Sequence, residues 1–339
     1  MVDYRLEENR REAFIRWYAW SLKNNDCDPS VWLTNYLNKR YEHNDEERIW
    51  LCWLYGNTYQ LPTTWVLKNE FPDFELATVD RIGQWNKANY KRLRYQTDTK
   101  WNKGHLPAMF ESYLKFIGKN TQRAALEKYY GDNEKQSFDN LWNAVKGELH
   151  KFGRYSTWFY LQHLRHTANI NIEPTSLMLD DYSGSRSHRN GLLLALGRDD
   201  DYDKKLTAGQ YRSLEVLGSG IICEMRDRFP ELEDINFFTM ETCLCSFKKI
   251  FRERNGRYLG YYLDRQSEEI AQAEQDGWSG IEWNVLWQAR DELLDKRLSG
   301  RAKIDKERFT FFLNSGRIDR LDWMFKDNHV MSGLEAFYD

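Results

Sequence analysis

The stretch GRYSTWFYLQHLRHTANINIEPTSLMLDDYSGSRSHRNG, residues 153–191, combines aromatic, acidic and basic side chains at high density. It begins with a Gly-Arg-Tyr turn and an aromatic segment of helical periodicity. A Glu-Pro break at Glu173, an Asp-Asp pair and a Ser/Arg/His/Asn loop follow, before five apolar residues. Guanidinium groups suit phosphate or carboxylate, and the acids suit proton transfer. The alternative interpretation is a capped, solvated loop between two helices.

Composition narrows the class of protein. The chain has 339 residues, of which 41% are hydrophobic and 15% aromatic, and this excludes a disordered protein. No apolar run approaches the roughly 20 residues of a membrane span, and the charged N-terminus carries no apolar signal core, so we expect a cytosolic protein. An odd number of cysteines predicts reduced thiols: Cys27, Cys52, Cys223, Cys243 and Cys245.

Helical periodicity dominates the chain and predicts an all-α, multi-helical fold. Apolar stripes run through residues 13–22 and 138–149, and another helix begins at Tyr155. Asp28 before Pro29 is typical of a helix N-cap followed by the first turn. Polar segments at 131–137 and 197–206 suggest an N-terminal helical region, 1–135, and a larger unit, 136–339, which could share one core. The tryptophans are expected mainly to fill the core.

Two basic clusters are candidates for DNA contact, although the net charge is −3. The first, within residues 87–105, interleaves lysine and arginine with aromatic residues, and the second covers residues 248–257. Basic groups neutralise phosphates and aromatic rings stack on bases, whereas the bland alternative is a solvated helix face. The residues assigned to DNA here are Lys91, Arg92, Arg94, Lys248 and Lys249.

A possible helix-hairpin-helix motif lies at Leu217-Gly218-Ser219-Gly220-Ile221. Two glycines would permit a sharp turn, and the free N–H groups of the following helix could hold a DNA phosphate. A plain helix–helix loop is the alternative. Glu241-Thr242 lies 21 residues after Gly220. In helix-hairpin-helix DNA glycosylases the catalytic acid, an Asp followed by Thr, lies about two dozen residues past the hairpin, so the spacing is similar, with Glu in place of Asp.

Other kinds of site have little support. His163 and His166 are three residues apart but have no partners at metal-ligand spacing, so we expect polar surface residues and no metal site. Walker, dinucleotide-binding and nucleophile-elbow motifs are absent from the sequence.

Together these segments resemble the amino acid:DNA transferases of bacteriophages with hypermodified thymines, the α-glutamyl/putrescinyl-thymine pyrophosphorylases. That family is viewed as a divergent branch of the DNA glycosylase superfamily. The resemblance covers roughly residues 140–265. It depends on Gly153-Arg154-Tyr155, Glu173-Pro174, Asp180-Asp181, Ser185-x-x-His188-Arg189-Asn190-Gly191 and the segment ending at Glu241.

The resemblance implies a reaction and its partners. An amino acid such as glycine would be transferred to pyrophosphorylated 5-hydroxymethyluracil in double-stranded phage DNA, in the cytoplasm of the infected bacterium, with release of pyrophosphate. No cofactor is implied, and a divalent cation is left open. The alternatives are a DNA glycosylase, or a non-enzymatic helical DNA-binding partner of a base-modifying kinase.

Chemical demands suggest a role for each candidate residue. Glu241 would stabilise positive charge at the reacting methylene, and Asp180, Asp181 or Glu241 would accept a proton, with His188 as a relay. Arginines would collect the departing pyrophosphate, and Tyr155 would stack on an extruded base. The residues assigned to pyrophosphate and base are Arg154, Tyr155, Ser185, Arg186, Arg189 and Asn190.

Overall fold

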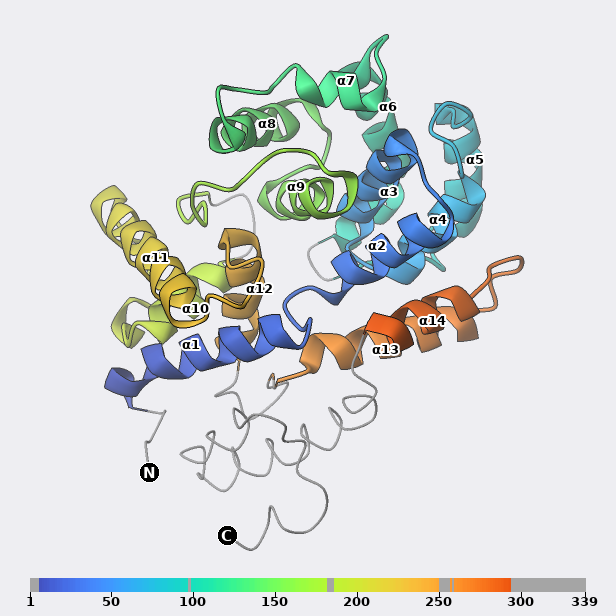
Figure 1. Ribbon diagram of the computed structural model, residues 1–339. Helices are drawn as coiled ribbons and strands as arrows, with labels where there is room; N and C mark the ends of the chain where they lie inside the picture. Colours follow the sequence, from blue (N-terminus) through green and yellow to red (C-terminus); the bar gives the residue numbers. More distant parts are fainter. Residues whose placement is uncertain (1–5, 97–98, 182–185, 250–256, 258, 294–339) are drawn as a thin grey trace, which may run out of the picture.

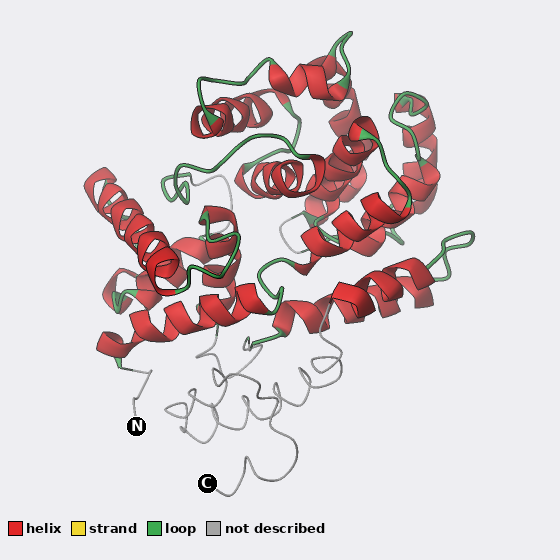
Figure 2. Cartoon of the chain, in the orientation of Figure 1, coloured by secondary structure: helices red, strands yellow, loops and turns green. Residues whose placement is uncertain are grey.

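The computed structural model describes residues 6–96, 99–181, 186–249, 257 and 259–293. All regular structure in these ranges is helical, so the predicted all-α, multi-helical fold is confirmed (Figure 2). The first seven α-helices are α1 (Glu7–Lys23), α2 (Pro29–Arg40), α3 (Asp45–Thr58), α4 (Leu61–Glu70), α5 (Val79–Asn89), α6 (Leu106–Ile117) and α7 (Gln122–Glu127). They are followed by α8 (Glu134–Glu148), α9 (Arg154–Ala168), α10 (Ser187–Ala195), α11 (Ala208–Arg228), α12 (Phe237–Phe247), α13 (Tyr261–Gln275) and α14 (Asn284–Leu293). Two short 3₁₀ helices are η1 (Lys100–His105) and η2 (Asp199–Asp201).

The helices form two lobes, each with its own hydrophobic core (Figure 1). The larger lobe is built from α2 to α9 with α13 and α14, and stacked aromatic rings such as Trp50 and Trp53 fill its centre. The smaller lobe contains α1, α10, α11 and α12. Helix α12 contributes to both, because Phe238 packs into the larger core and Met240 into the smaller. Side chains on α12 therefore lie at the junction of the lobes.

Each lobe is assembled from segments that are distant in sequence. Helix α1 joins the core formed by α10, α11 and α12, whereas α13 and α14 return to the core of the N-terminal helices. Both cores contain segments from either side of residue 135. The division of the chain into residues 1–135 and 136–339 stays a prediction.

Helix α9 lies against α3, and the apolar stripes predicted for this region are buried. The backbones approach closely at Gly56, where an added Cβ would lie 2.9 Å from the Cβ of Tyr160. The stripe of α8 packs beside α9, with its five apolar positions buried as the periodicity predicts: Phe138, Leu141, Trp142, Val145 and Leu149.

The helix-hairpin-helix prediction at Gly218 and Gly220 is wrong, because both glycines lie inside the continuous helix α11. A capping box between Thr207 and Gln210 starts this helix firmly. Gly218 faces the core, where a Cβ would contact the side chains of Leu177, Leu192 and Met240. Packing of a whole face therefore outweighs the cost of about 1 kcal/mol that each glycine imposes on a helix.

Two further predictions concern α9 and the cysteines. The expectation that His163 is a surface residue is wrong, since its ring is fully buried and stacks on Tyr55 with centroids 3.8 Å apart. His166 is also largely buried, with 11% of its side chain exposed. All five cysteines are free, in agreement with the predicted thiols. Among the described helices, none is long and apolar enough to cross a membrane.

Candidate active site

Helices α10 and α12 cross in direct backbone contact and thereby bring His188 beside Glu241. A Cβ on Gly191 would lie 2.1 Å from the carbonyl oxygen of Leu244, so this crossing requires glycine. The Nδ1 atom of His188 lies 3.7 Å from Oε1 of Glu241. Both side chains are almost completely buried. The crossing therefore joins two segments that are 53 residues apart.

Arg154, the first residue of α9, completes this cluster. Its Nη1 atom donates to Oε1 of Glu241 at 3.4 Å, and its Nη2 atom donates to the carbonyl oxygen of Leu177 at 3.0 Å. The guanidinium also lies over the ring of Trp158. Glu215 accepts hydrogen bonds from two backbone N–H groups of the loop that contains Leu177. The loop before Asp180 and Asp181 is thus fixed to the site from two sides.

The site carries an excess of positive charge. Burial lowers the pKa of His188 well below its usual range, and the charges of Arg154, Arg189 and Lys248 lower this pKa further. His188 is therefore a neutral imidazole at physiological pH. Its Nε2 atom has no hydrogen-bond partner among the described residues. A neutral ring next to Glu241 can exchange a proton or orient a substrate without adding charge.

Cys245 and Lys248 extend the cluster along α12 and its end. The Sγ atom of Cys245 donates to Oε1 of Glu241 at 3.6 Å, and burial together with this carboxylate raises the pKa of the thiol. Lys248 donates to Oγ of Ser187, at the start of α10, with a distance of 2.6 Å. Lys248 was predicted to contact DNA as part of a basic run, and the fold places it in this cluster.

The remaining motif residues on α10 point toward α11 and the acidic loop near η2. Arg189 is 1% exposed and donates to the hydroxyl of Tyr211 at 3.0 Å. Asn190 donates to Oδ1 of Asp203 at 2.5 Å. Arg186 is exposed and donates to the carbonyl oxygen of the same aspartate. These contacts orient the N-terminal turn of α10 and leave Arg186 accessible at its edge.

Other predicted residues lie outside the central cluster. Asp180 is exposed, and Asp181 forms an ion pair with Lys146. Tyr155 is half-buried and contacts the rings of Tyr59 and Phe159. Ser185 falls outside the described residues.

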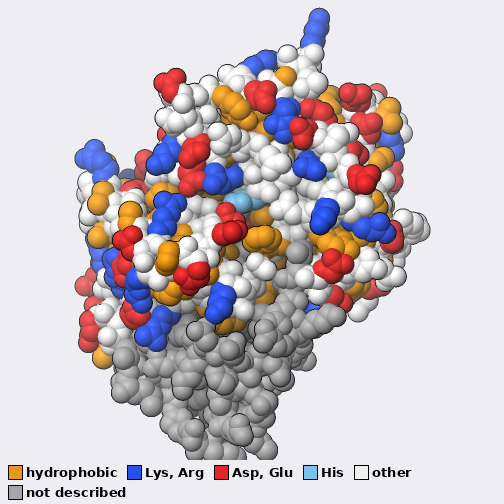
Figure 3. All heavy atoms as spheres, in the orientation of Figure 1, with side chains coloured by type: hydrophobic (Ala, Val, Ile, Leu, Met, Phe, Trp, Pro, Cys, Tyr) orange, Lys and Arg blue, Asp and Glu red, His pale blue; other side chains and the backbone are white. Residues whose placement is uncertain are grey.

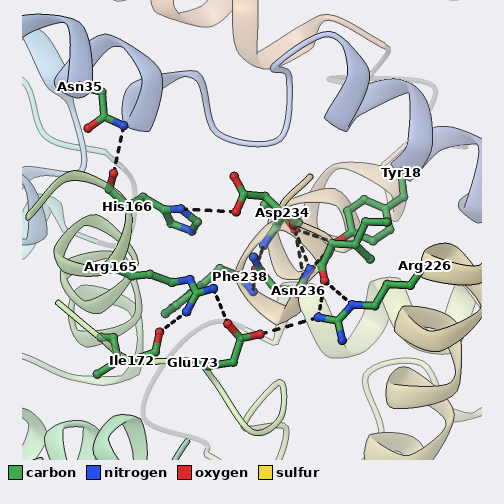
Figure 4. A network of polar contacts seen from close by, with 12 residues as sticks. Tyr18, Asn35, Arg165, His166, Ile172, Glu173, Arg226, Asp234, Asn236 and Phe238 are labelled. Atoms are coloured by element: carbon green, nitrogen blue, oxygen red, sulfur yellow. Dashed lines mark hydrogen bonds and ion pairs between the residues drawn. The ribbon is translucent and has the colours of Figure 1, made fainter. Parts of the chain in front are cut away.

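Glu173, from the Glu-Pro motif, ties the two lobes together at the opposite end of α9 (Figure 4). Its carboxylate lies 2.6 Å from Nη2 of Arg165 on α9 and 3.9 Å from Nη2 of Arg226 on α11. In the same network, Nδ1 of His166 lies 3.9 Å from Oδ1 of Asp234. The geometry assigns Glu173 a structural bridging position.

Asp28 is an acidic residue near the site that sequence reasoning treated only as a helix cap. It does occupy the N-cap position of α2, but its side chain makes no capping hydrogen bond. Its Oδ1 atom instead accepts from the hydroxyl of Ser30 at 2.5 Å. Burial raises the pKa of Asp28 to about 6, the Ser30 hydrogen bond and Arg265 lower this pKa, and the charge of Glu241 raises it. The missing cap bond is a tertiary feature with no signal in the sequence.

Three tyrosines form an aromatic wall beside the acids, and of these only Tyr155 was predicted from the sequence. Tyr59, Tyr155 and Tyr262 come from three different helices or helix ends, and Arg265 lies over the rings of Tyr59 and Tyr262. Packing among α3, α9 and α13 brings these tyrosines together, so no regular spacing in the sequence indicates that they are neighbours.

The first basic cluster is partly committed to intramolecular contacts. Arg94 forms an ion pair with Asp276, with Nε 2.5 Å from Oδ2, and Arg92 lies over the ring of Trp278. Lys91 is exposed. Basic and acidic side chains are interspersed over the face shown in Figure 3. The described His, Cys, Asp and Glu residues include no group of three or more arranged to hold a metal ion.

The fold and site define an all-helical protein in which a buried carboxylate, held by an arginine beside a neutral histidine, lies at the junction of two lobes. The family described as amino acid:DNA transferase matches residues 13–255, and the chain belongs to this family. The match starts well before the segment that carries the resemblance in the sequence. A serinyltransferase of Salmonella phage ViI is 28% identical over 309 residues, which cover 85% of this chain and 75% of the relative. No solved structure gave a significant match.

Proposed function

We propose that this amino acid:DNA transferase acts on phage DNA in the cytoplasm of the infected bacterium. Its substrates are duplex DNA containing pyrophosphorylated 5-hydroxymethyluracil and a free amino acid, and pyrophosphate is released. The observation that carries the proposal is the buried carboxylate of Glu241, between Arg154 and His188. Family membership supports the transfer of an amino acid to DNA. The relative's name makes serine a donor to test beside glycine.

The reaction forms one bond and breaks one bond. The ammonium group of the amino acid first gives one proton to a carboxylate, and the free amine nitrogen then forms a bond to the methylene carbon on the pyrimidine. The bond from this carbon to the pyrophosphate oxygen breaks, and its electron pair leaves with pyrophosphate. The new secondary ammonium then loses a proton to solvent or to a carboxylate. Positive charge develops on the methylene as the leaving group departs, and Glu241 stabilises this charge in a site that excludes water.

We infer two roles for the cations from their burial and contacts. Arg154 and Arg189 are each 1% exposed and bonded to protein groups, so they hold Glu241 and α10 in place and add positive potential. Arg186 is exposed and Lys248 half-buried, which makes these two the groups that contact pyrophosphate. Ser187, bonded to Lys248, begins α10, and the positive end of the helix dipole there also favours an anion.

The environments of the acids also separate their roles. Asp181 forms an ion pair with Lys146, which makes it a poor proton acceptor. Asp180 is exposed and lies at the edge of the site. Tyr155, half-buried in the aromatic wall, remains the candidate that stacks on an extruded base. Gly218 and Gly220 lose their DNA-binding role with the hairpin.

A direct assay tests the proposal. The protein is incubated with duplex DNA bearing pyrophosphorylated 5-hydroxymethyluracil and a pool of amino acids, and the DNA is digested to nucleosides for mass spectrometry. We expect a nucleoside with the mass of one added amino acid, and equimolar pyrophosphate. Release of the free base would identify a glycosylase, and DNA binding without either product would identify a binding module; both results overturn the proposal.

A further inference from the structure

A small cavity lies between the two lobes. Its volume is about 200 Å³, below the roughly 300–1,000 Å³ of pockets for drug-sized ligands, so it suits a small molecule. Its walls come from the end of α1, the start of α2, the middle of α9 and the segment leading into α12. The residues that line it are Leu22, Asn25, Cys27, Asp28, Val31, Trp32, Gln162, His166, Glu231, Leu232, Glu233, Asp234 and Thr239.

The charge of this cavity is opposite to that of the cluster around Glu241. Four of its lining residues are acidic, Asp28, Glu231, Glu233 and Asp234, and lysine and arginine are absent from the lining. Burial lowers the pKa of His166 to about 4, so this histidine adds no positive charge to the lining at neutral pH. Such a cavity attracts a cation and repels phosphate or carboxylate.

Two of the residues that line the cavity each carry a buried acceptor atom without a donor. Oδ2 of Asp28 and Oε1 of Gln162 have no hydrogen-bond partner among the described residues, and these side chains belong to residues only 7% and 1% exposed. A buried carboxylate oxygen without a donor is costly unless a ligand satisfies it. A primary ammonium group offers three donors and a positive charge. The described acids here include no group arranged for a metal ion.

We propose that this cavity binds the ammonium group of the amino-acid donor, with the side chains of Asp28 and Gln162 turning toward it as the acceptors. The inference rests on the proposed function for the identity of the ligand. It adds the site at which the amine waits, which is separate from the cationic cluster that takes pyrophosphate. Because the lining holds no cation for a carboxylate, the ammonium end enters and the carboxylate end faces the mouth.

The position of the cavity agrees with this role. Asp28 is close enough to Glu241 for the two carboxylates to interact electrostatically. At the far side, His166 and Asp234 approach each other across the gap between α9 and the segment before α12 (Figure 4). An amine bound to Asp28 is therefore next to the carboxylate assigned to the methylene.

Ligand pairs that differ only in the ammonium group test the proposal on the unaltered protein. Glycine and L-serine are titrated by ligand-observed NMR, and each is compared with the hydroxy acid of the same shape, glycolate or L-glycerate. We expect the better amino acid to bind about tenfold or more tightly than its hydroxy analogue, because the analogue lacks the charge-assisted hydrogen bonds. Equal affinity within each pair overturns the proposal.

Variants locate the binding site. Asp28→Asn keeps the shape and the acceptor for Ser30 but removes the charge, and we expect about tenfold weaker binding of the amino acid with unchanged affinity for duplex DNA. Gln162→Leu, a second variant that leaves Asp28 intact, weakens binding severalfold. Asp139→Asn is the matched control, since Asp139 also accepts one hydroxyl hydrogen bond, from Thr175, and lies outside the cavity. Wild-type affinity in both cavity variants overturns the assignment.

The two proposals fail in different ways. If amino acids bind through their ammonium group but no nucleoside adduct forms with any donor, the proposed reaction is wrong and the cavity assignment stands. If adducts form and Asp28→Asn leaves the KM for the amino acid unchanged, the cavity assignment is wrong and the reaction stands.

Discussion

Gly191 on α10 and Leu244 on α12 are in backbone contact, with room for only a hydrogen atom between the Cα of the first and the carbonyl oxygen of the second. Three residues before each of them lie His188 and Glu241, the pair at the centre of the candidate site. The geometry of the site is therefore coupled to one close crossing of helices.

Substituting Gly191 tests this coupling. Gly191→Ala places a methyl group where the Leu244 carbonyl lies, so α10 and α12 must separate. We expect a loss of about 1–3 kcal/mol in the free energy of unfolding, measured by urea denaturation, together with a marked loss of transfer activity. Gly220→Ala is the control, because its Cβ meets nothing within 4 Å on an exposed turn of α11. The control should gain about 0.5–1 kcal/mol. An alanine at 191 without effect would show that the crossing is unimportant.

Removing the charge of Glu241 should affect the chemical step. Glu241→Gln keeps the size of the side chain but cannot stabilise a cationic methylene, and we expect the single-turnover rate of adduct formation to fall by about a hundredfold or more. Affinity for the modified duplex should change little, because the carboxylate is buried and an anionic group does not attract phosphate. Fluorescence anisotropy measures that affinity. Loss of DNA binding in proportion to the loss of rate would instead assign Glu241 a structural role.

Local patterns in the sequence were sufficient for the fold class and for several helices. The stripe from Phe138 to Leu149 and the cap pair Asp28-Pro29 predicted α8 and the start of α2, because periodicity and caps are local properties. The prediction of a hairpin at Gly218 and Gly220 was wrong because it, too, used only local sequence. Their local signal indicates a turn, whereas the packing that keeps α11 straight comes from Leu177 and other distant residues.

The candidate site was predictable only in part. Arg154, His188 and Glu241 belong to polar segments that stand out in the sequence, and the fold brings all three together. Asp28 could not be identified, since its N-cap position hides a side chain that turns away from the helix. The sequence predicted that Lys248 contacts DNA, because it begins a run of basic residues. The contact with Ser187 shows where its ammonium group lies in the fold.

The raised pKa of Asp28 predicts a pH-dependent stability change. Its folded-state pKa is about 6, against an ordinary value of 3.8, mainly because of burial. Below about pH 3.8 the carboxyl group is mostly protonated in both the folded and the unfolded chain, so its burial lowers the stability little. As the pH rises, burial of the charge lowers the free energy of unfolding, and this loss is complete above about pH 6. We expect Asp28→Asn to raise the free energy of unfolding at pH 8 by up to about 3 kcal/mol and to change it little at pH 4.

Thermal unfolding monitored by circular dichroism at the two pH values checks this expectation. Asp139→Asn again provides the control for replacing an aspartate that accepts one hydroxyl hydrogen bond. A destabilised Asp28→Asn protein at pH 8 would mean that the carboxylate is satisfied within the fold, and this result would remove its proposed availability to a ligand.

Lys91 and Arg94 lie three residues apart in the first basic cluster, yet they should respond differently to neutralisation. Lys91 is exposed, so Lys91→Gln should weaken binding to any duplex and reduce the slope of log K against log salt by about one unit. Arg94 is paired with Asp276 at the end of α13, so Arg94→Gln should instead lower the melting temperature slightly, by the small value of an exposed ion pair. Anisotropy titrations at several salt concentrations separate the two effects. If Lys91→Gln leaves the salt slope unchanged, the first cluster is a solvated surface and DNA approaches from another face.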